Sequence, residues 1–311
     1  MRGRTQTARQ ADAAKLARIA IMTLDFQAML KLPGQPDSPA RTLEIFDIPQ
    51  MYADVYGVHN IEFQHSHILS TEDAYLKELR AQVDKTKSRI TNINLEFGPM
   101  NISSADPVQR VQAIDLTNRW VDHAVLLGCP RVMINQGQVT DENKVWGIPT
   151  LTAMGDYGRS KRIMVSVETR GNGQPGPGLG RLSPPAPTPA PAPGAAPAGG
   201  RGAAAAPPAP VVTVPPAWVL LAEIIKDSGT YSNVDLGNVA AQNQGELHAA
   251  LRALLPMTVN NIHTRVNTLW DLATALKFMV GNLGYTGLFS IEVNNGHEGV
   301  RNIYNIVLDS I

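Results

Sequence analysis

The sequence has a single cysteine and no net charge, and each feature excludes a class of protein. Cys129 alone cannot form an intramolecular disulfide framework or a thiolate metal cluster. Its place directly after Gly128, at the start of an expected strand, indicates core packing. The 27 basic and 27 acidic residues balance, whereas nucleic-acid binding usually requires a basic excess or stripe. We therefore expect no nucleic-acid partner.

Long hydrophobic runs are also missing from the sequence. No stretch of about 18 apolar residues could form a transmembrane helix. Residues 1–15 carry Arg2, Arg4 and Arg9 without the apolar core of a secretory signal peptide, and we expect them to form an N-terminal extension. The sequence thus predicts a soluble, cytoplasmic protein with no membrane partner, and an exported mature form is the alternative.

One internal segment has almost no side chains to bury. Fourteen of the 23 prolines fall between Gly171 and Pro216, among alanines and glycines. This composition is typical of disordered or polyproline II segments rather than of a fold element. We therefore expect residues 16–311 to form one domain, interrupted by a low-complexity insertion at residues 172–215.

Short apolar runs alternate with amphipathic segments along the rest of the chain. Residues 163–167, for example, are largely apolar and β-branched, as in a strand that is buried on both faces. Eight such strand and helix pairs favour a (β/α)8 TIM barrel of the α/β class over a doubly wound sheet. The expected strands are 16–24, 58–63, 90–95, 131–135, 163–167, 231–235, 259–263 and 288–292, and the expected helices are 41–56, 70–83, 106–128, 150–159, 218–226, 246–254, 269–280 and 300–308.

The last four expected strands each end on a side chain that can bind a metal. These side chains are Glu168, Asp235, His263 and Glu292. The second to third and the third to fourth are each separated by about one strand, one helix and two loops, so parallel strands would aim them at one point. Three carboxylates and an imidazole suit a divalent ion, with Mn²⁺ or Mg²⁺ favoured over structural zinc. The alternative is four unrelated polar residues that cap strands.

Polar residues near the ends of other strands are further candidates. Glu62 lies near the end of the second expected strand, His65 and His67 follow it, and Asn135 ends the fourth. The two histidines are interpreted as ligands, substrate contacts or exposed loop residues. Because active groups of such barrels sit at the carboxyl ends of strands, we expect Glu62, His65 and Asn135 to contact substrate.

Arg265 lies two residues beyond His263, so its guanidinium should point to the same mouth of the barrel. Guanidinium groups bind anions through several N–H donors in a fixed arrangement. We expect Arg265 to clamp an anionic or hydroxyl group of a substrate. A structural ion pair is the alternative.

Several short motifs together resemble the xylose-isomerase-like TIM barrels of the sugar phosphate isomerase/epimerase family. The resemblance spans the chain apart from the insertion. It rests on the order and spacing of V-S-V-E-T, L-G-C-P-R-V-M-I-N-Q-G, N-V-D-L-G-N, N-I-H-T-R and S-I-E-V, which contain the four candidate ligands. The resemblance implies that Glu168, Asp235, His263 and Glu292 hold one divalent ion, Mn²⁺ first, with Mg²⁺, Co²⁺ or Zn²⁺ as alternatives.

The resemblance also implies a reaction. In the family, the ion chelates neighbouring oxygens of a sugar or keto-sugar, and the two glutamates flank the carbon between those oxygens. One carboxylate would then act as general base and the other as general acid, through an enediolate that the metal stabilises. These catalytic roles fall on Glu168 and Glu292.

The chain departs from the family pattern at two places. Family epimerases often have a histidine three residues after the aspartate, where this chain has Asn238, which we expect to contact substrate instead. Related DNA-repair endonucleases need further histidines and an Asp-x-His motif after the strand-seven histidine. Residues 264–267 read T-R-V-N here, which argues against a nuclease.

Three functions remain open from the sequence. The first is a metal-dependent isomerase or epimerase of a sugar or keto-sugar. The second is a lyase, dehydratase or deglycosylating enzyme that uses the same metal site. The third is a catalytically silent sugar-binding barrel. No Gly-rich phosphate cradle is visible, which favours unphosphorylated substrates. A homo-oligomer or a partner subunit is left open.

Overall fold

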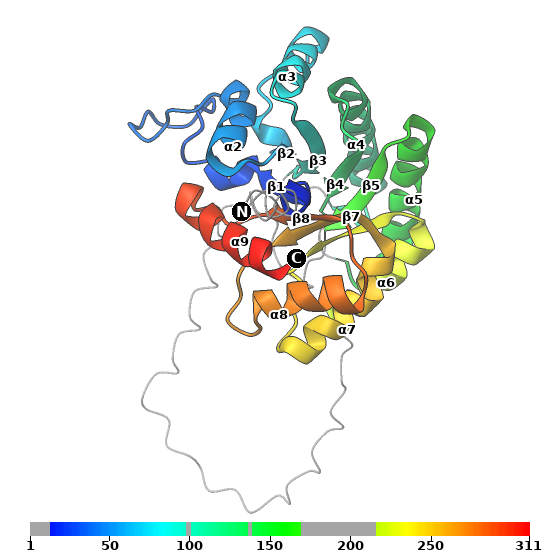
Figure 1. Ribbon diagram of the computed structural model, residues 1–311. Helices are drawn as coiled ribbons and strands as arrows, with labels where there is room; N and C mark the ends of the chain where they lie inside the picture. Colours follow the sequence, from blue (N-terminus) through cyan, green and yellow to red (C-terminus); the bar gives the residue numbers. More distant parts are fainter. Residues whose placement is uncertain (1–12, 98–100, 136–138, 169–215) are drawn as a thin grey trace, which may run out of the picture.

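The computed structural model describes residues 13–97, 101–135, 139–168 and 216–311 (Figure 1). Eight parallel strands of the described chain pair in sequence order and close into one barrel, around which the helices pack (Figure 1). Closure comes from parallel pairing of the first strand with the last, in which Ile19 lies opposite Phe289. The predicted (β/α)8 TIM barrel is confirmed.

The strands occupy the positions that their apolar runs predict. Nearly all of their residues are buried, because helices cover the outside of the barrel and side chains fill its interior. The strands are β1 (Ile19–Met22), β2 (Asn60–Gln64), β3 (Arg89–Leu95), β4 (Arg131–Ile134), β5 (Met164–Glu168), β6 (Tyr231–Asp235), β7 (Thr258–Thr264) and β8 (Leu288–Ile291).

The helices follow the strands in alternation. They are α2 (Ile48–Tyr56), α3 (Asp73–Lys85), α4 (Pro107–Leu127), α5 (Lys144–Lys161), α6 (Ala217–Ser228), α7 (Gln244–Leu254), α8 (Leu272–Lys277) and α9 (Gly296–Ser310). The predicted ends of α4 are confirmed: the Val108 N–H donates to Oδ1 of Asp106 at 2.9 Å, and Gly128 adopts the left-handed conformation with φ 69°.

Several helices differ from the prediction at their ends; α9, for example, begins four residues before the expected start at 300. Residues 41–44 are not helical, because Leu43 forms a bridge with Leu30 and Pro49 suits the first turn of a helix that begins later. The helix expected at 150–159 begins at Lys144 and contains Pro149. Gly147 and Pro149 disfavour a helix locally, which is why the sequence pattern did not extend the helix to Lys144, and Gly147 packs closely against Ser103. The helix expected at 269–280 begins at Leu272 as α8 and continues as a π-helical turn at Phe278–Asn282.

The remaining fold predictions concern the ends, the insertion and the cysteine. Cys129 is buried as predicted, and burial raises the pKa of its thiol to about 12, which disfavours the nucleophilic thiolate. The expected insertion at 172–215 lies outside the described residues; it follows β5, which ends at Glu168. Lys15, at the end of the expected N-terminal extension, donates a hydrogen bond from Nζ to the Leu308 carbonyl at 2.6 Å. None of the helices in the described ranges has the length and apolar character that crossing a bilayer requires.

Candidate metal centre

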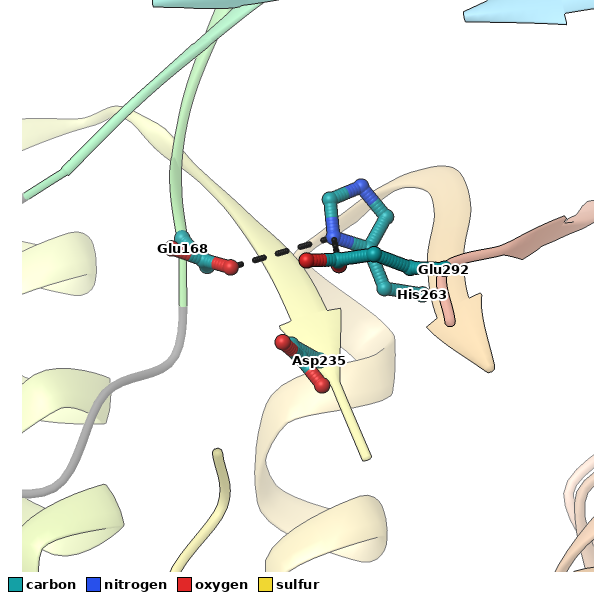
Figure 2. Close-up of side chains that lie close together, drawn as sticks. All are labelled: Glu168, Asp235, His263 and Glu292. Atoms are coloured by element: carbon teal, nitrogen blue, oxygen red, sulfur yellow. Dashed lines mark ion pairs between the residues drawn. The ribbon is translucent and has the colours of Figure 1, made fainter. Parts of the chain in front are cut away.

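Four buried side chains meet at the carboxyl ends of β5, β6, β7 and β8 (Figure 2). Each offers one ligand atom, and these atoms all lie within 4.8 Å of one another. No side chain of the four is more than 3% exposed. The prediction that parallel strands bring Glu168, Asp235, His263 and Glu292 to one point is confirmed.

The strand register explains this convergence. Asp235 pairs directly with His263 across β6 and β7, so the two side chains share one level of the barrel. Beyond β8, the Glu292 N–H donates to the Thr264 carbonyl at 3.2 Å, which holds Glu292 beside the end of β7. The ends of neighbouring parallel strands, together with the first residue after β8, thus place the four side chains next to one another.

The imidazole of His263 faces two of the carboxylates. Its Nδ1 atom lies 2.8 Å from Oε2 of Glu292 and 3.8 Å from Oε1 of Glu168. Within the described ranges, neither Nδ1 nor Oε2 of Glu292 has a hydrogen bond of acceptable geometry. Buried polar atoms nearly always have partners, and a cation bound between these two atoms would provide one.

The charges of the cluster also fit a divalent cation. Burial raises the pKa of Asp235 to about 8. The positive charge of Arg265 opposes this rise, and the carboxylates of Glu292 and Glu168 add to it. Burial alone would lower the pKa of His263, but the carboxylates of Glu62 and Glu292 raise it well above its usual range. Buried carboxylates that crowd together are costly unless a positive charge compensates them. A divalent ion would supply that charge, and oxygen-rich sites with one imidazole suit Mn²⁺ or Mg²⁺.

Arg265 and Asn238 contact the candidate ligands from the mouth of the barrel. Nη2 of Arg265 lies 2.6 Å from Oδ2 of Asp235 and is also ion-paired with Oε1 of Glu292. Nδ2 of Asn238 donates to Oδ2 of Asp235 at 2.7 Å and to Oε1 of Glu168 at 3.3 Å. Both side chains therefore orient carboxylates of the cluster, and the structural ion pair considered for Arg265 is present.

Glu62 contacts the imidazole of His263 inside the barrel. Its side chain is completely buried and reaches from β2 to β7, where Oε1 lies 2.7 Å from Nε2 of His263. The carboxylate thus lies on the far side of the imidazole from the cluster. Glu62 thus contacts a candidate ligand, and its contact with substrate stays a prediction.

The other sequence candidates lie outside the four-residue cluster. Nδ1 of His65 accepts a hydrogen bond from the Glu96 N–H at 3.1 Å, and its ring packs edge-on against Phe97 and Trp120. His67 is buried, with Nδ1 2.9 Å from Oγ1 of Thr23, and burial lowers the pKa of its imidazole to about 4.

Asn135 directly follows β4 and is half-buried. Its Oδ1 atom has no hydrogen-bond partner among the residues that the structure describes. A role for Asn135 and His65 in binding substrate stays a prediction.

Asp25 is a supporting residue that the sequence did not reveal. Asp25 is buried in the short segment that directly follows β1. Its Oδ1 accepts hydrogen bonds from the N–H groups of Val293 at 2.6 Å and Asn294 at 3.3 Å. These bonds tie the start of the barrel to the turn that follows Glu292. The only sequence signal was a carboxylate shortly after an apolar run, which many loops share.

No protein-family model and no curated protein matches the sequence. Solved structures do match its fold. A xylose isomerase domain protein from Planctomyces limnophilus aligns with 94% of this chain and 96% of its own length, at 14% identity and a TM-score of 0.61. A D-tagatose 3-epimerase-like protein aligns with 94% of this chain and 97% of its own length, at 14% identity and a TM-score of 0.63.

A third similar structure is the apo form of a 3-keto-D-glucoside 4-epimerase from E. coli. It aligns with 95% of this chain and 100% of its own length, at 10% identity and a TM-score of 0.62. At such low identities, similarity establishes the fold. The predicted resemblance to xylose-isomerase-like TIM barrels is therefore confirmed as a resemblance of fold.

Proposed function

We propose that this protein is a divalent-metal-dependent isomerase or epimerase that acts on a sugar or keto-sugar. The observation that carries the proposal is the convergence of Glu168, Asp235, His263 and Glu292 at the ends of four consecutive strands, with ligand atoms within 4.8 Å of one another. Proteins of the same fold are described as a D-tagatose 3-epimerase-like protein and a 3-keto-D-glucoside 4-epimerase, which supports this class of reaction.

The four residues would hold one ion, with Mn²⁺ favoured and Mg²⁺, Co²⁺ or Zn²⁺ as alternatives. When bound, such an ion supplies positive charge that stabilises negative charge developing next to a substrate carbonyl. Arg265 and Asn238 would keep the carboxylates of Asp235, Glu168 and Glu292 oriented toward it, through the hydrogen bonds and ion pairs described above.

Glu168 and Glu292 would transfer the proton. They come from β5 and from the end of β8, so they flank Asp235 and His263 along the rim of the barrel (Figure 2). A carboxylate on one side of a sugar carbon can remove its proton, while a carboxylate on the other side can return a proton to the opposite face. This sequence of events inverts the carbon. Return of the proton to the neighbouring carbon would instead give an isomer.

A panel of keto-sugars in D₂O tests the proposal most clearly. The Mn²⁺-loaded protein should incorporate deuterium at a carbon next to the carbonyl and form an epimer or isomer. Glu168→Gln and Glu292→Gln should each abolish the incorporation while the protein stays folded, because an amide keeps the packing but cannot accept the proton. Glu78→Gln, which alters an exposed carboxylate on α3, is the matched control.

The products separate the competing functions. An unsaturated or cleaved product would indicate the lyase, dehydratase or deglycosylating reaction. Asn238 keeps this alternative open, because its amide occupies the position where family epimerases often have an imidazole. Binding of Mn²⁺ without exchange or product from any sugar would contradict both enzymes and leave the sugar-binding barrel.

A further inference from the structure

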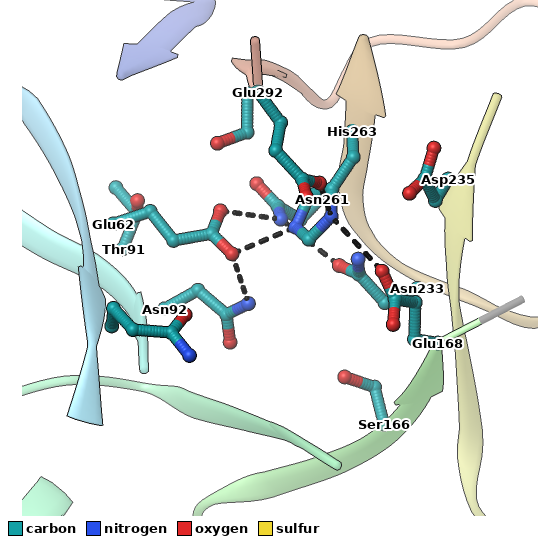
Figure 3. Close-up of polar contacts among 12 residues, drawn as sticks. Glu62, Thr91, Asn92, Ser166, Glu168, Asn233, Asp235, Asn261, His263 and Glu292 are labelled. Atoms are coloured by element: carbon teal, nitrogen blue, oxygen red, sulfur yellow. Dashed lines mark hydrogen bonds and ion pairs between the residues drawn. The ribbon is translucent and has the colours of Figure 1, made fainter. Parts of the chain in front are cut away.

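The interior of the barrel directly below the metal centre is polar. TIM barrel interiors are usually filled by branched apolar side chains. Here, six polar side chains near the centre are fully buried: Glu62, Asn92, Ser166, Asn233, Asn261 and Ser290. Figure 3 shows Glu62 extending from one side of the barrel toward Asn261 and His263 on the other. A buried carboxylate in this position requires a set of donors.

Three N–H groups surround the Glu62 carboxylate. Oε1 lies 2.7 Å from Nε2 of His263 and accepts from Nδ2 of Asn92 at 2.9 Å (Figure 3). Oε2 accepts from Nδ2 of Asn261 at 3.1 Å, and that amide also donates to Oδ1 of Asn233 at 3.0 Å. The asparagines thus surround the carboxylate with donors. An ionised carboxylate is only an acceptor, so Nε2 of His263 must be the donor in this contact.

The two nitrogens of the His263 ring therefore have separate partners. Nε2 faces Glu62 in the polar interior, while Nδ1 faces Glu292 and Glu168 in the candidate metal centre. A ring nitrogen binds a metal only through its lone pair, and a proton fixed on one nitrogen leaves the lone pair on the other. Carboxylates that accept the second N–H of a metal-binding histidine fix both its tautomer and its ring orientation.

We propose that Glu62 is a positioning residue, which holds His263 with a proton on Nε2 so that Nδ1 is the atom presented to the metal. This inference rests on the proposed metal centre. The imidazole of His263 separates Glu62 from the cluster, so we assign Glu62 no proton transfer with a substrate. Its effect on any reaction passes through the geometry and affinity of the metal site.

Titration of the metal-free protein with Mn²⁺ tests the inference without measuring activity. Glu62→Gln should weaken Mn²⁺ binding by about 10- to 100-fold, the usual effect of losing the carboxylate behind a ligand histidine. Glu62→Met removes the acceptor completely and should weaken binding further, whereas the amide of Gln keeps one acceptor for Nε2. The comparison separates loss of charge from loss of the hydrogen bond.

Thr91→Val is the matched control. Thr91 is buried on β3 next to Asn92. Its hydroxyl donates to the Ile61 carbonyl at 3.1 Å, so it lies in the same part of the barrel but bonds to the backbone rather than to the side chain of Glu62 or His263. Its loss should cost about 1 kcal/mol of stability and leave Mn²⁺ affinity unchanged. A weaker affinity in this variant equal to that of Glu62→Gln would mean that general loosening of the core explains the result.

The nitrogen that binds the metal gives a second readout. In the Zn²⁺-loaded protein, ¹⁵N NMR of the histidine side chains should show His263 bound through Nδ1, with a slowly exchanging proton on Nε2. A metal bond through Nε2, or Mn²⁺ affinity of folded Glu62→Met within about twofold of the wild type, would overturn the role of Glu62. Failure of the wild-type chain to bind Mn²⁺ would instead overturn the metal centre itself.

Discussion

A Cβ atom on Gly237 would lie 2.2 Å from Cδ of Arg265. Arg265 therefore occupies the space that any side chain at position 237 would need. Gly237 also donates its N–H to Oδ1 of Asp235 at 2.7 Å, while Arg265 contacts Oδ2 of the same carboxylate. Asp235 thus accepts from the backbone of position 237 through one oxygen and contacts Arg265 through the other, and Arg265 can lie there only because position 237 has no side chain.

Gly237→Ala should consequently displace Arg265. We expect a loss of about 1 to 3 kcal/mol in the free energy of unfolding, which is typical when an added methyl group meets a packed neighbour. Urea denaturation of the metal-free protein measures the loss. Gly281→Ala is the control, because nothing lies within 4 Å of its added Cβ, and it should be neutral or slightly stabilising. Equal stability of Gly237→Ala and the wild type would show that Arg265 moves aside without cost.

Asp235→Asn should separate metal binding from stability. The raised pKa of Asp235 means that its negative charge is disfavoured in the folded protein, so this group costs stability increasingly as pH rises above its unfolded pKa and toward about 8. Without metal, at neutral pH, the Asn variant should be as stable as the wild type or more stable.

Addition of Mn²⁺ should reverse that order. A ligand at 100 times its dissociation constant stabilises a folded protein by about 2.7 kcal/mol. The variant should lack this stabilisation, because its site binds Mn²⁺ more weakly. Melting temperatures with Mn²⁺ and with a chelator measure both effects. An equal rise of the melting temperature in both proteins would exclude Asp235 as a ligand.

His67 should make stability fall in mild acid. Burial lowers the pKa of its imidazole to about 4, whereas the unfolded chain titrates near the usual value of 6.5. The unfolded state thus binds the additional proton between these two values, and stability is lost as pH falls from 6.5 to 4. The loss attributable to His67 between pH 7 and pH 4 is about 3 kcal/mol.

The variant His67→Asn isolates this contribution, because it removes the titrating group and can retain a hydrogen bond to Thr23. The difference in unfolding free energy between wild type and variant should shrink by that amount over the same pH range. A constant difference between wild type and His67→Asn from pH 7 to pH 4 would mean that His67 has the same pKa in the folded protein as in the unfolded chain.

Much of the barrel could be predicted because its determinants are local. Each strand is a short apolar run, and Glu168, Asp235, His263 and Glu292 each stand at the end of one. The closed topology then brings the four ends together, so their spacing in sequence was enough to predict their meeting in space. The start of the helix that contains Pro149 could not be predicted in this way, because Gly147 and Pro149 are poor helix formers and yet lie in its first turns.

The supporting residues could not be predicted because they depend on contacts across the barrel. Glu62 and His263 are 201 residues apart and lie on strands that do not pair. Because Glu62 lies near the end of an expected strand, the sequence did not distinguish it from residues that line the mouth of the barrel. Only the direction of its side chain, inward toward Asn92 and Asn261, shows that it contacts a candidate ligand. Side-chain direction at a strand end depends on barrel shear, which the sequence does not show directly.

Anomalous diffraction from a crystal of the protein soaked in Mn²⁺ would locate the bound ion. We expect one strong manganese peak per chain at the ends of β5 to β8. It should lie about 2.0 to 2.6 Å from Nδ1 of His263 and from a carboxylate oxygen each of Glu168, Asp235 and Glu292. A saturated crystal with no peak there, or with a peak that any one of the four residues fails to contact, would contradict the metal centre and the function proposed from it.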